Sequence, residues 1–551
     1  MKRHIGIMLI LSLSLHQLVT AQNTVGLIQS TDESSPGYTL FTPNKSHSTY
    51  LIDNEGRLIR EWVSDYLPTL SVYLLENGDL LRSAALTSDD SPRTGGFQLF
   101  NWEGDLLWEY YCGPQHHDIE PLPNGNVLVI KNDQKTSDTA LSAGRDPALI
   151  DGPSIRSTSI FEVQQAGPDS GTVVWEWNAW DHLIQNFDST KTNFGVVSDH
   201  PELMDINFAR DGGASWLHTN GIDYNPGLDQ IVLSNRAINE LWIIDHSTTM
   251  DEAASHSGGN SGLGGDLLYR WGNPVGYGAG DTTDQQLFSQ HDARWVLEGY
   301  PGAGNLTVFS NGEDRPTGEY ATVEELILPI DSLGAYLLLP GEAYAPSAPF
   351  WTYAAEVELN FQASRYGGAH RLPNGNTLIC SPLEGKIFEV TPELGLVWEY
   401  INPVSENGIL YQGDIPELNT MFRGERYATD YSGFYGRDLT PGDPIEQYSN
   451  GVGNLVQTPD ASYLADAFPN PFNPSTTLRF HLRESSHVTL RVYDIRGDLI
   501  RELITGQMIP GVHQLAWDGR DNNGLAAPSG VYVYRLESAR FTQAKRMVLI
   551  R

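Results

Sequence analysis

The chain repeats one phrase three times, as LENGDLL at residues 75–81, LPNGNVL at residues 122–128 and LPNGNTL at residues 372–378. In each copy an Asn-Gly pair stands between apolar residues. Asn and Gly tolerate the positive φ angles that a tight hairpin turn requires, so each copy predicts a β-hairpin. The phrase therefore indicates a repeated antiparallel unit.

Each unit continues with an alternating strand, a turn and a strand that ends in tryptophan. These strands end at Trp62, Trp108, Trp175, Trp271, Trp351 and Trp398. Successive tryptophans are 46, 67, 96, 80 and 47 residues apart, which suits four strands per unit with long insertions in the middle units. Six units predict a six-bladed β-propeller, in which residues 37–62 complete the last blade and close the ring. A set of stacked sandwiches is the alternative.

The composition agrees with an acidic all-β protein. The 551 residues include 69 acidic and 34 basic side chains, a formal charge of −35. This balance excludes nucleic acid and anionic membranes as main partners, because they are bound by clustered Lys and Arg. A hydrophobic content of 40% supplies a core, and 54 Gly with 32 Pro indicate many turns.

Residues 1–21 have the pattern of a secretory signal peptide, with Lys2 and Arg3 followed by an apolar run and small residues before Gln22. We therefore expect an exported, soluble chain that is not an integral membrane protein, with the propeller at residues 22–446. Cys112 and Cys380 either form one disulfide or remain two free thiols.

Residues 447–462 are polar and Gly-rich and are predicted to be a linker, and residues 463–551 alternate as in a small β-sandwich. Within that sandwich the motifs are FPNPFNPST at 468–476, VYDIRG at 492–497, WDGRD at 517–521 and SGVY at 529–532. They resemble the immunoglobulin-like C-terminal sorting domain of type IX secretion. The resemblance implies transit across an outer membrane through an export machinery, then release or surface attachment. A carbohydrate-binding or purely structural sandwich is the alternative.

Histidines recur just before the first strand of a predicted blade. The groups are His116-His117-Asp118, His218-Thr219-Asn220, Gln290-His291-Asp292 and Ala369-His370-Arg371. The innermost strands of a propeller line its central channel, so their starting residues are expected to converge near one mouth. Arg236 lies on the stretch that follows His218 and is expected to point to the same place.

Such a cluster suits transfer of an anionic group. Neutral imidazole is a nucleophile and a general base near pH 7, and the Arg fork matches tetrahedral oxyanions such as sulfate. Together they suit a covalent histidine intermediate. A zinc or copper site is the rival interpretation, but the spacing lacks a local His-x-x-x-His pair and Arg236 sits poorly beside a cation. In the plainest alternative, each histidine only caps a strand.

Several of these motifs resemble the bacterial arylsulfate sulfotransferase family. They are HHD at 116–118, HTNGI at 218–222, Arg236, QHDAR at 290–294, GNL at 304–306 and FRGERY at 422–427. The resemblance covers residues 37–437. It implies a six-bladed propeller that moves a sulfuryl group from a phenolic sulfate ester to a phenolic acceptor, without the nucleotide donor PAPS, another cofactor or a metal.

By this resemblance His291 is the nucleophile that becomes sulfated. His218 and His117 would bind the sulfuryl oxygens and shuttle the phenol proton. His117 is preferred over His116 because His117-Asp118 repeats the pattern of residues 291–292. Arg236, Thr219 and Asn220 would complete the oxyanion clamp, with Arg236 counted among the catalytic residues. His116 is a further substrate-binding candidate, and His370 is a candidate pocket residue because it lies at a blade start, not because it matches a family position. Aromatic side chains expected to hold the rings are Trp216, Phe288, Trp295 and Tyr366. A non-enzymatic surface propeller for binding or adhesion is the alternative function.

Overall fold

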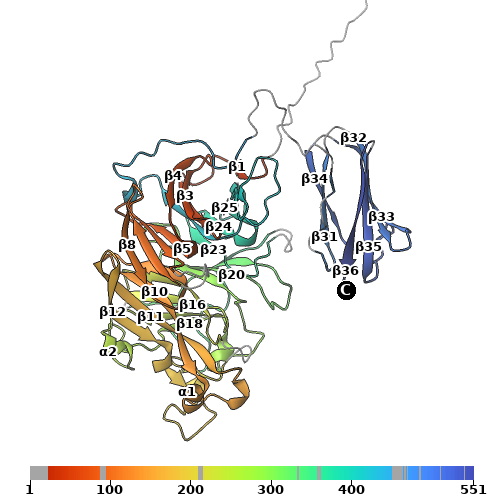
Figure 1. The fold of residues 1–551 in the computed structure, drawn as a ribbon. Coiled ribbons are helices and arrows are strands. Elements are labelled where there is room, and N and C mark those ends of the chain that lie inside the picture. The colour runs from red at the N-terminus through yellow and green to blue at the C-terminus, as the bar shows by residue number, and fades with distance from the viewer. Residues whose placement is uncertain are drawn as a thin grey trace, which may run out of the picture. The chain divides into compact units, whose positions relative to one another are not determined.

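The computed structural model describes residues 23–86, 95–208, 215–331, 334–355, 361–448, 463–464, 467, 470–482, 486–508, 511–538 and 540–551. The predicted signal peptide and residues 449–462 of the predicted linker lie outside the described residues. Two compact units are present, one of residues 24–447 and one that contains residues 448–551. Figure 1 labels their elements.

Six antiparallel sheets make up the first unit. The first three, each from its innermost strand outward, are β29(Met421–Ala428)-β2(Gly37–Pro43)-β3(Ser48–Asp53)-β4(Leu58–Val63), β5(Pro68–Leu74)-β6(Leu80–Ala84)-β7(Gly96–Phe100)-β8(Leu106–Tyr111) and β9(Gln115–Pro121)-β10(Val127–Thr136)-β11(Ser154–Gly167)-β12(Ser170–Asn178). The other three are β15(Thr219–Asn225)-β16(Gln230–Asn235)-β17(Glu240–Asp245)-β18(Tyr269–Trp271), β19(His291–Trp295)-β20(Leu306–Ser310)-β21(Thr322–Leu326)-β22(Trp351–Tyr353) and β23(Gly368–Arg371)-β24(Thr377–Ser381)-β25(Lys386–Val390)-β26(Leu396–Ile401)-β1(Gly26–Ser30).

The sheets form a closed ring, because each innermost strand packs against the innermost strand of the next sheet: β5 on β9, β9 on β15, β15 on β19, β19 on β23, β23 on β29 and β29 on β5. The predicted six-bladed propeller is confirmed. Strand β29 pairs with β2, with Gly37 opposite Ala428, so the closing blade joins both ends of the unit. A second closure comes from β1, which pairs with β26.

The repeated residues of the sequence have clear places in the blades. Each Asn-Gly phrase joins the first two strands of a blade, and each of the six repeat tryptophans lies on the fourth strand. Every one of these tryptophans donates its Nε1 proton to an oxygen of the next blade, over 2.8 to 3.0 Å. The pairs are Trp62 to Asn101, Trp108 to Ser170, Trp175 to Thr248, Trp271 to Pro346, Trp351 to Pro392 and Trp398 to Asn54. The tryptophan ends the repeat because it links neighbouring blades.

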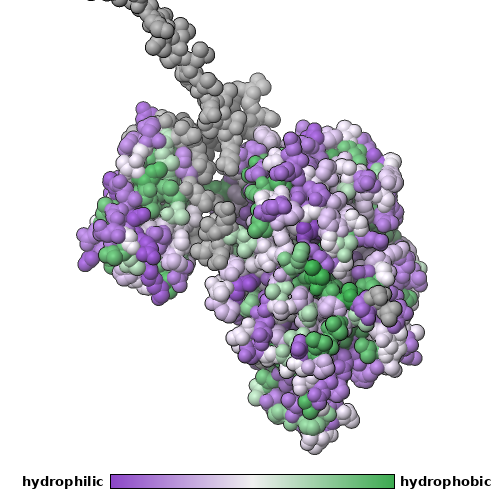
Figure 2. Space-filling model, turned by 180° about the vertical axis from the view of Figure 1, so that it is seen from behind, coloured by the Kyte–Doolittle hydropathy of each residue, from purple (hydrophilic) through white to green (hydrophobic). Residues whose placement is uncertain are grey.

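Insertions between the blade strands carry the remaining elements of this unit. They are α1(Ser137–Ser142), α2(Met250–Ala253), β13(Leu183–Ile184) with β14(Met204–Asp205), β27(Val404–Ser405) with β28(Gly408–Ile409), and single 3-10 turns at Pro147–Leu149, Ala179–Asp181, Val197–Asp199, Pro274–Tyr277, Pro382–Glu384 and Ser432–Phe434. No helix among the described residues is long and apolar enough to span a bilayer. In the space-filling view of Figure 2, hydrophilic residues dominate the visible face of this unit, with a smaller hydrophobic area among them.

The second unit is a two-sheet sandwich. Its sheets are β30(Tyr463–Leu464)-β31(Thr476–Leu482)-β34(Gly511–Trp517) and β33(Leu499–Met508)-β32(Ser486–Asp494)-β35(Gly530–Glu537)-β36(Thr542–Leu549). Alternate residues of β31 and β32, such as Phe480 and Leu490, are buried against Trp517. The predicted immunoglobulin-like sandwich is confirmed.

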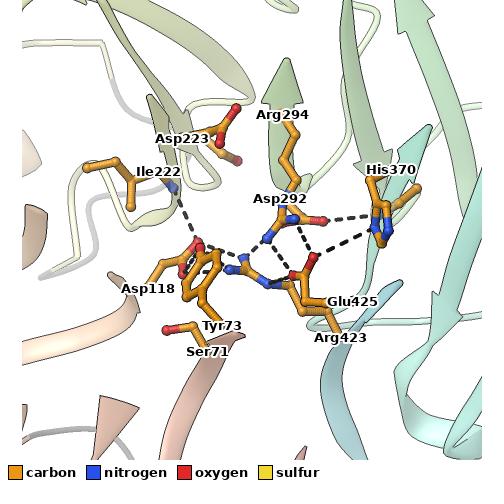
Figure 3. A network of polar contacts seen from close by, with 12 residues as sticks. Ser71, Tyr73, Asp118, Ile222, Asp223, Asp292, Arg294, His370, Arg423 and Glu425 are labelled. Carbon is orange, nitrogen blue, oxygen red and sulfur yellow. Dashed lines mark hydrogen bonds and ion pairs between the residues drawn. The ribbon is translucent and has the colours of Figure 1, made fainter. Parts of the chain in front are cut away.

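A buried ion network lies where the innermost strands meet (Figure 3). The Arg423 guanidinium on β29 donates to both oxygens of Asp118 on β9, at 2.8 and 3.0 Å, and to Asp292 on β19, at 2.8 Å. It also donates to the Tyr73 hydroxyl on β5. Asp118 in turn accepts the backbone N–H of Ile222 on β15, at 3.4 Å.

The same network reaches the sixth innermost strand through Asp292. This carboxylate accepts the backbone N–H of Ala369 on β23, at 3.1 Å, and the Arg294 Nε, at 2.9 Å. Arg294 also makes a bidentate pair with Glu425, at 2.6 and 2.7 Å. Burial opposes ionisation of Asp292, but the charges of Arg294 and Arg423 outweigh it and lower the pKa of that carboxyl group. All six innermost strands are therefore tied together by charged hydrogen bonds.

The two cysteines are free thiols in the structure, which decides between the two states that the sequence left open. Cys380 is buried on β24, and Cys112 is half-buried after β8. Burial raises the pKa of the Cys112 thiol to about 12, so this side chain is an unreactive packing group.

We expect Arg423→Met to lower the free energy of unfolding by about 3 kcal/mol or more, because buried Asp118 loses its counter-ion and buried Asp292 loses one of its two. Urea denaturation at neutral pH measures this effect. Arg437→Met is the control, since Arg437 pairs with the exposed Glu103 and such pairs contribute about 1 kcal/mol or less. Equal losses in the two variants would show that the network does not hold the ring.

Candidate active site

The four histidine groups lie at the starts of four innermost strands. His116 and His117 are in β9, His218 immediately precedes β15, His291 opens β19 and His370 lies in β23. The pairing of β9, β15 and β19 with the second strands of their blades shifts register at these starts. Such bulges turn side chains away from the regular alternation of a strand.

Residues with positive φ angles occur at or near the same strand starts. His117, His218 and Asp292 have φ angles of 59°, 51° and 52°, and Ser289 and Tyr366 have 56° and 63°. Residues other than glycine rarely adopt the left-handed region, and they cluster at functional sites where the surrounding structure enforces it. The surrounding structure holds these residues in a strained backbone conformation, and that conformation sets the direction of their side chains.

Three of the imidazoles form one chain of contacts. The Nδ1 atoms of His116 and His117 are 2.7 Å apart, so one ring donates a proton to the other. The ring centroids of His117 and His218 are 5.1 Å apart. Burial lowers the pKa of His116 to about 3, with a further contribution from the positive charges of His218 and Arg156. His116 is thus a neutral ring near pH 7.

His291 is 1% exposed, and its tautomer follows from its neighbour Asn311. The Asn311 side-chain amide donates to the carbonyl oxygens of Ala363 and Tyr366, at 2.6 and 2.9 Å. Its Oδ1 therefore faces His291 Nδ1 at 2.7 Å and must accept a proton from it. The Nε2 atom then carries the lone pair, and it accepts the Tyr366 N–H at 3.3 Å.

The electrostatic surroundings keep His291 neutral. Burial lowers the pKa of His291 to about 3, against the effect of the Asn311 hydrogen bond. The positive charges of Arg236 and His218 lower it further, which places both groups within electrostatic reach of His291. A buried neutral imidazole whose Nε2 carries the lone pair needs no prior deprotonation near pH 7 to act as a nucleophile, once the Tyr366 N–H releases that lone pair.

Arg236 follows the second strand of the β15 blade, and its backbone N–H donates to the His218 carbonyl at 3.2 Å. Its guanidinium, 20% exposed, forms an ion pair with Glu313. The Ser289 hydroxyl donates to the same Glu313 oxygen at 2.9 Å. The Glu313 carboxylate is thus paired with the Arg236 guanidinium, which is the cationic group expected to bind a sulfuryl oxygen.

Thr219 and Asn220 are buried and hold other members of the site. The Thr219 hydroxyl donates to Asn235 Oδ1 at 2.6 Å, and the Asn220 amide donates to the Gln290 carbonyl at 2.8 Å. Four residues of this region each have a buried polar atom with no hydrogen-bond partner among the described residues, namely His116 Nε2, Asn220 Oδ1, Asn235 Nδ2 and Gln290 Oε1, and atoms of this kind occur elsewhere in the chain as well. Buried polar groups normally have partners, so these four are available to a polar ligand.

His370 contacts a different set of groups. Its Nε2 accepts the Arg426 N–H at 3.2 Å, and its Nδ1 lies 3.9 Å from Glu425 in the central network (Figure 3). Burial lowers its pKa to about 4. Asp118 and Asp292 likewise turn to the network, although each directly follows a histidine of the cluster.

Only one of the four expected aromatic residues is a ring neighbour of His291. The Tyr366 ring lies 6.5 Å from the His291 ring, as does the ring of Phe422, which the sequence analysis did not select. Trp216 and Trp295 are part of the blade cores.

A cavity of about 280 Å³ adjoins the Arg236–Glu313 pair. Its walls are Phe208, Ala237, Ile238, Asn239, Asn273, Val275, Thr282, Gln285, Glu313 and Asp314. An engineered cavity of about 150 Å³ is large enough for benzene, so this volume can take a phenyl ring.

Sequence reasoning missed Asn235, Asn311 and Glu313. A local signal existed for the first two, because Ser234-Asn235 and Ser310-Asn311 both end the second strand of a blade. Each Asn then contacts the residue that begins the first strand, Thr219 or His291.

The fold and site define a class of protein, a six-bladed propeller with a histidine and arginine cluster at the starts of its innermost strands. The family model "Arylsulfotransferase (ASST)" matches residues 20–327, more than half of the chain. The chain therefore belongs to the arylsulfotransferase family. A second model, "FlgD Ig-like domain", matches residues 472–540 in the sandwich.

Curated relatives match a part of the chain. The basal-body rod modification protein FlgD of Escherichia coli is 27% identical over 134 residues, which are 24% of this chain and 56% of that protein. The Salmonella typhimurium FlgD is 25% identical over the same length. The chain thus spans about half the length of these relatives.

Among solved structures, a protein of unknown function from Bacteroides caccae is 14% identical, with a TM-score of 0.36, and the match covers 71% of this chain and 98% of that one. The β-propeller domain of Cps50 (Swd1) from Myceliophteria thermophila is 11% identical, with a TM-score of 0.34, and the match covers 70% and 88%.

We expect His291→Gln to flatten the pH dependence of stability. The folded pKa of about 3 lies below the usual value of about 6.5, so between these values only the unfolded chain takes up the proton. Stability from this group is present above pH 6.5 and is lost as the pH falls. Between pH 7 and 5 the wild type should lose about 2 kcal/mol more than the variant in urea denaturation.

Because the comparison is a difference between two slopes, contributions from other titrating groups cancel. His200→Gln, which changes a half-exposed histidine outside the cluster, controls for loss of an imidazole as such. Identical slopes in wild type and His291→Gln would mean that the pKa of His291 is the same in the folded and the unfolded protein.

Proposed function

We propose that this protein is an aryl-sulfate sulfotransferase that acts through a sulfohistidine at His291. The observation that carries the proposal is the lone pair on the buried neutral Nε2 of His291, which the Asn311 hydrogen bond fixes and which a substrate must take over from the Tyr366 N–H. Membership of the arylsulfotransferase family supports the reaction class.

In the first step, His291 Nε2 attacks the sulfur of a phenolic sulfate ester. A nitrogen–sulfur bond forms, the bond from sulfur to the phenolic oxygen breaks, and that oxygen leaves with the electron pair. Charge develops on the three sulfuryl oxygens and on the leaving oxygen, where preorganised donors are most effective. The available donors are the Arg236 guanidinium and the unpartnered Asn235 amide.

A proton must reach the leaving phenolate and be taken back from the acceptor. His117 and His218 suit this role, because they are only partly buried and their rings are in contact. In the second step the acceptor phenol gives its proton to this pair, its oxygen attacks the sulfur, and the nitrogen–sulfur bond breaks. Two displacements on one nucleophile predict ping-pong kinetics.

In this scheme Glu313 competes with the substrate for the Arg236 guanidinium. Its carboxylate pairs with Arg236 and Ser289, so a sulfate ester must displace it or share the guanidinium. The cavity beside this pair, with Phe208 and Val275 in its walls, suits the aromatic ring of the ester. A substrate that places its ring there would bring its sulfuryl group to Arg236.

We also propose that the chain is exported and reaches the cell surface or the medium. The support is the signal-peptide pattern of residues 1–21 and the sorting-domain motifs of the sandwich. Expression with and without residues 463–551, followed by fractionation of cells and medium, tests this role of the sandwich.

We expect His291→Ala to lower acceptor-dependent release of nitrophenolate from p-nitrophenyl sulfate by about a thousandfold or more, because the nucleophile is lost. The assay compares release with and without added phenol. With donor alone, mass spectrometry of the wild type should find one added SO₃ group on the peptide that contains His291. His200→Ala, a change outside the cluster, should keep wild-type rates.

Release without an acceptor would indicate a sulfatase on the same scaffold. No release with several donors would favour a binding propeller instead of an enzyme.

We expect Arg236→Met to reduce kcat/KM for the donor by about 100-fold, which is typical for loss of one charge-stabilising group in a transition state. The Glu313→Gln variant should lower the donor KM, because the competing carboxylate charge is gone. Steady-state kinetics of both variants test the assignment. A Glu313→Gln enzyme with a higher KM would show that Glu313 positions Arg236 productively.

A further inference from the structure

A second histidine cluster lies away from the catalytic set and uses none of its residues. His182 follows the 3-10 turn Ala179–Asp181, His256 lies in the insertion after α2, and Asp266 precedes β18. The Nδ1 atoms of His182 and His256 are each 2.7 Å from the same oxygen, Oδ1 of Asp266. One ligand atom from each residue lies within 4.8 Å of the other two.

The His182 ring is oriented as a metal ligand usually is. It is wholly buried, is stacked on Trp177 with an interplanar angle of 8°, and donates Nε2–H to the Ala253 carbonyl at 2.9 Å. Ligating histidines almost always donate the second ring N–H to a carbonyl or carboxylate, which directs the other lone pair at the metal. In the neutral ring, the Nδ1 lone pair of His182 faces the Asp266 oxygen.

Two acceptors that face each other need either a shared proton or a metal cation between them. A proton on the ring or on the carboxyl group would serve, and so would a metal cation. Two imidazole nitrogens and one carboxylate oxygen form the donor set that favours zinc among the common divalent ions, whereas magnesium and calcium prefer oxygen ligands. We propose that His182 Nδ1, His256 Nδ1 and Asp266 Oδ1 bind one Zn²⁺ ion, with water as the fourth ligand.

The site can expand to the distances that zinc requires. Tetrahedral ligands at about 2.0–2.1 Å from zinc are about 3.3 Å from each other, so the present spacing of 2.7 Å must open by about half an ångström. His256 can provide its part of this movement because its side chain is 61% exposed, and the buried His182–Asp266 pair must open by the same amount. The exposed face is also the route for the metal and the fourth ligand.

The insertion is built to bring these residues together. The Gly265 N–H donates to the Ser255 carbonyl at 3.0 Å, which closes the insertion so that His256 and Asp266 become neighbours. A Cβ atom at Gly265 would lie 2.6 Å from His182 Nε2 and 2.0 Å from the Ala253 oxygen, so only glycine allows this approach. A bound Zn²⁺ would pin the insertion to the segment that follows β12.

Zinc binding to the metal-free full-length protein tests the proposal. Isothermal titration with ZnCl₂ should show one site per chain, and Zn²⁺ should raise the Tm of the wild type. We expect His256→Ala to weaken zinc binding at least tenfold and to abolish the rise in Tm, while the exposed position of His256 leaves the fold intact, as circular dichroism can verify. Asp266→Asn should act in the same direction.

Two controls make the result specific. His200→Ala removes a half-exposed histidine that pairs with a single carboxylate, Glu202, and should keep wild-type affinity. His218→Ala removes a ring of the candidate active site and should also keep it. Loss of zinc binding in His218→Ala with retention in His256→Ala would overturn the proposal, and so would the absence of stoichiometric binding in the wild type.

Discussion

The buried guanidinium of Arg423 is the constraint on which the rest of the propeller depends. Six strands that meet around one axis bring polar groups into a place that is closed to water, and a buried charge is costly unless it is paired. Asp118, Asp292 and the Tyr73 hydroxyl all accept from this one cation. At the rim the six tryptophans link each blade to the next, so the ring is held at the hub and at the edge.

The hub also explains the geometry of the candidate active site. Asp118 and Asp292 directly follow His117 and His291, and their carboxylates are held by Arg423. Left-handed backbone at His117 and Asp292 then separates the paths of neighbouring side chains, so that the acid turns to the network while the imidazole joins the site. The ion network and the histidine cluster are thus built from adjacent residues in the same strands.

The chain as a whole is strongly acidic, whereas the histidine cluster combines uncharged rings with a cationic side chain. The protein carries a formal charge of −35, yet the cluster combines neutral imidazoles with Arg236. Burial keeps His116 and His291 uncharged, so that Arg236 supplies the attraction for an anion and His291 keeps its lone pair. Glu313 balances Arg236 in the absence of substrate.

The sequence by itself determined the repeat, the all-β class, the six blades, the sandwich, and the histidine groups at the blade starts, because turns, alternation and strand ends are local patterns. It also placed residues 37–62 in the closing blade, but it did not show that β29 is the innermost strand there. Only the tertiary structure decided which side chains meet. Asn311 selects the tautomer of His291, Glu313 occupies Arg236, and Arg423 joins Asp118 to Asp292 across 305 and 131 residues of sequence. His182 likewise meets Asp266 across 84 residues. Contacts of this kind follow from ring closure and from the folding of long insertions. Both bring distant residues together, and no local sequence pattern predicts which residues will meet.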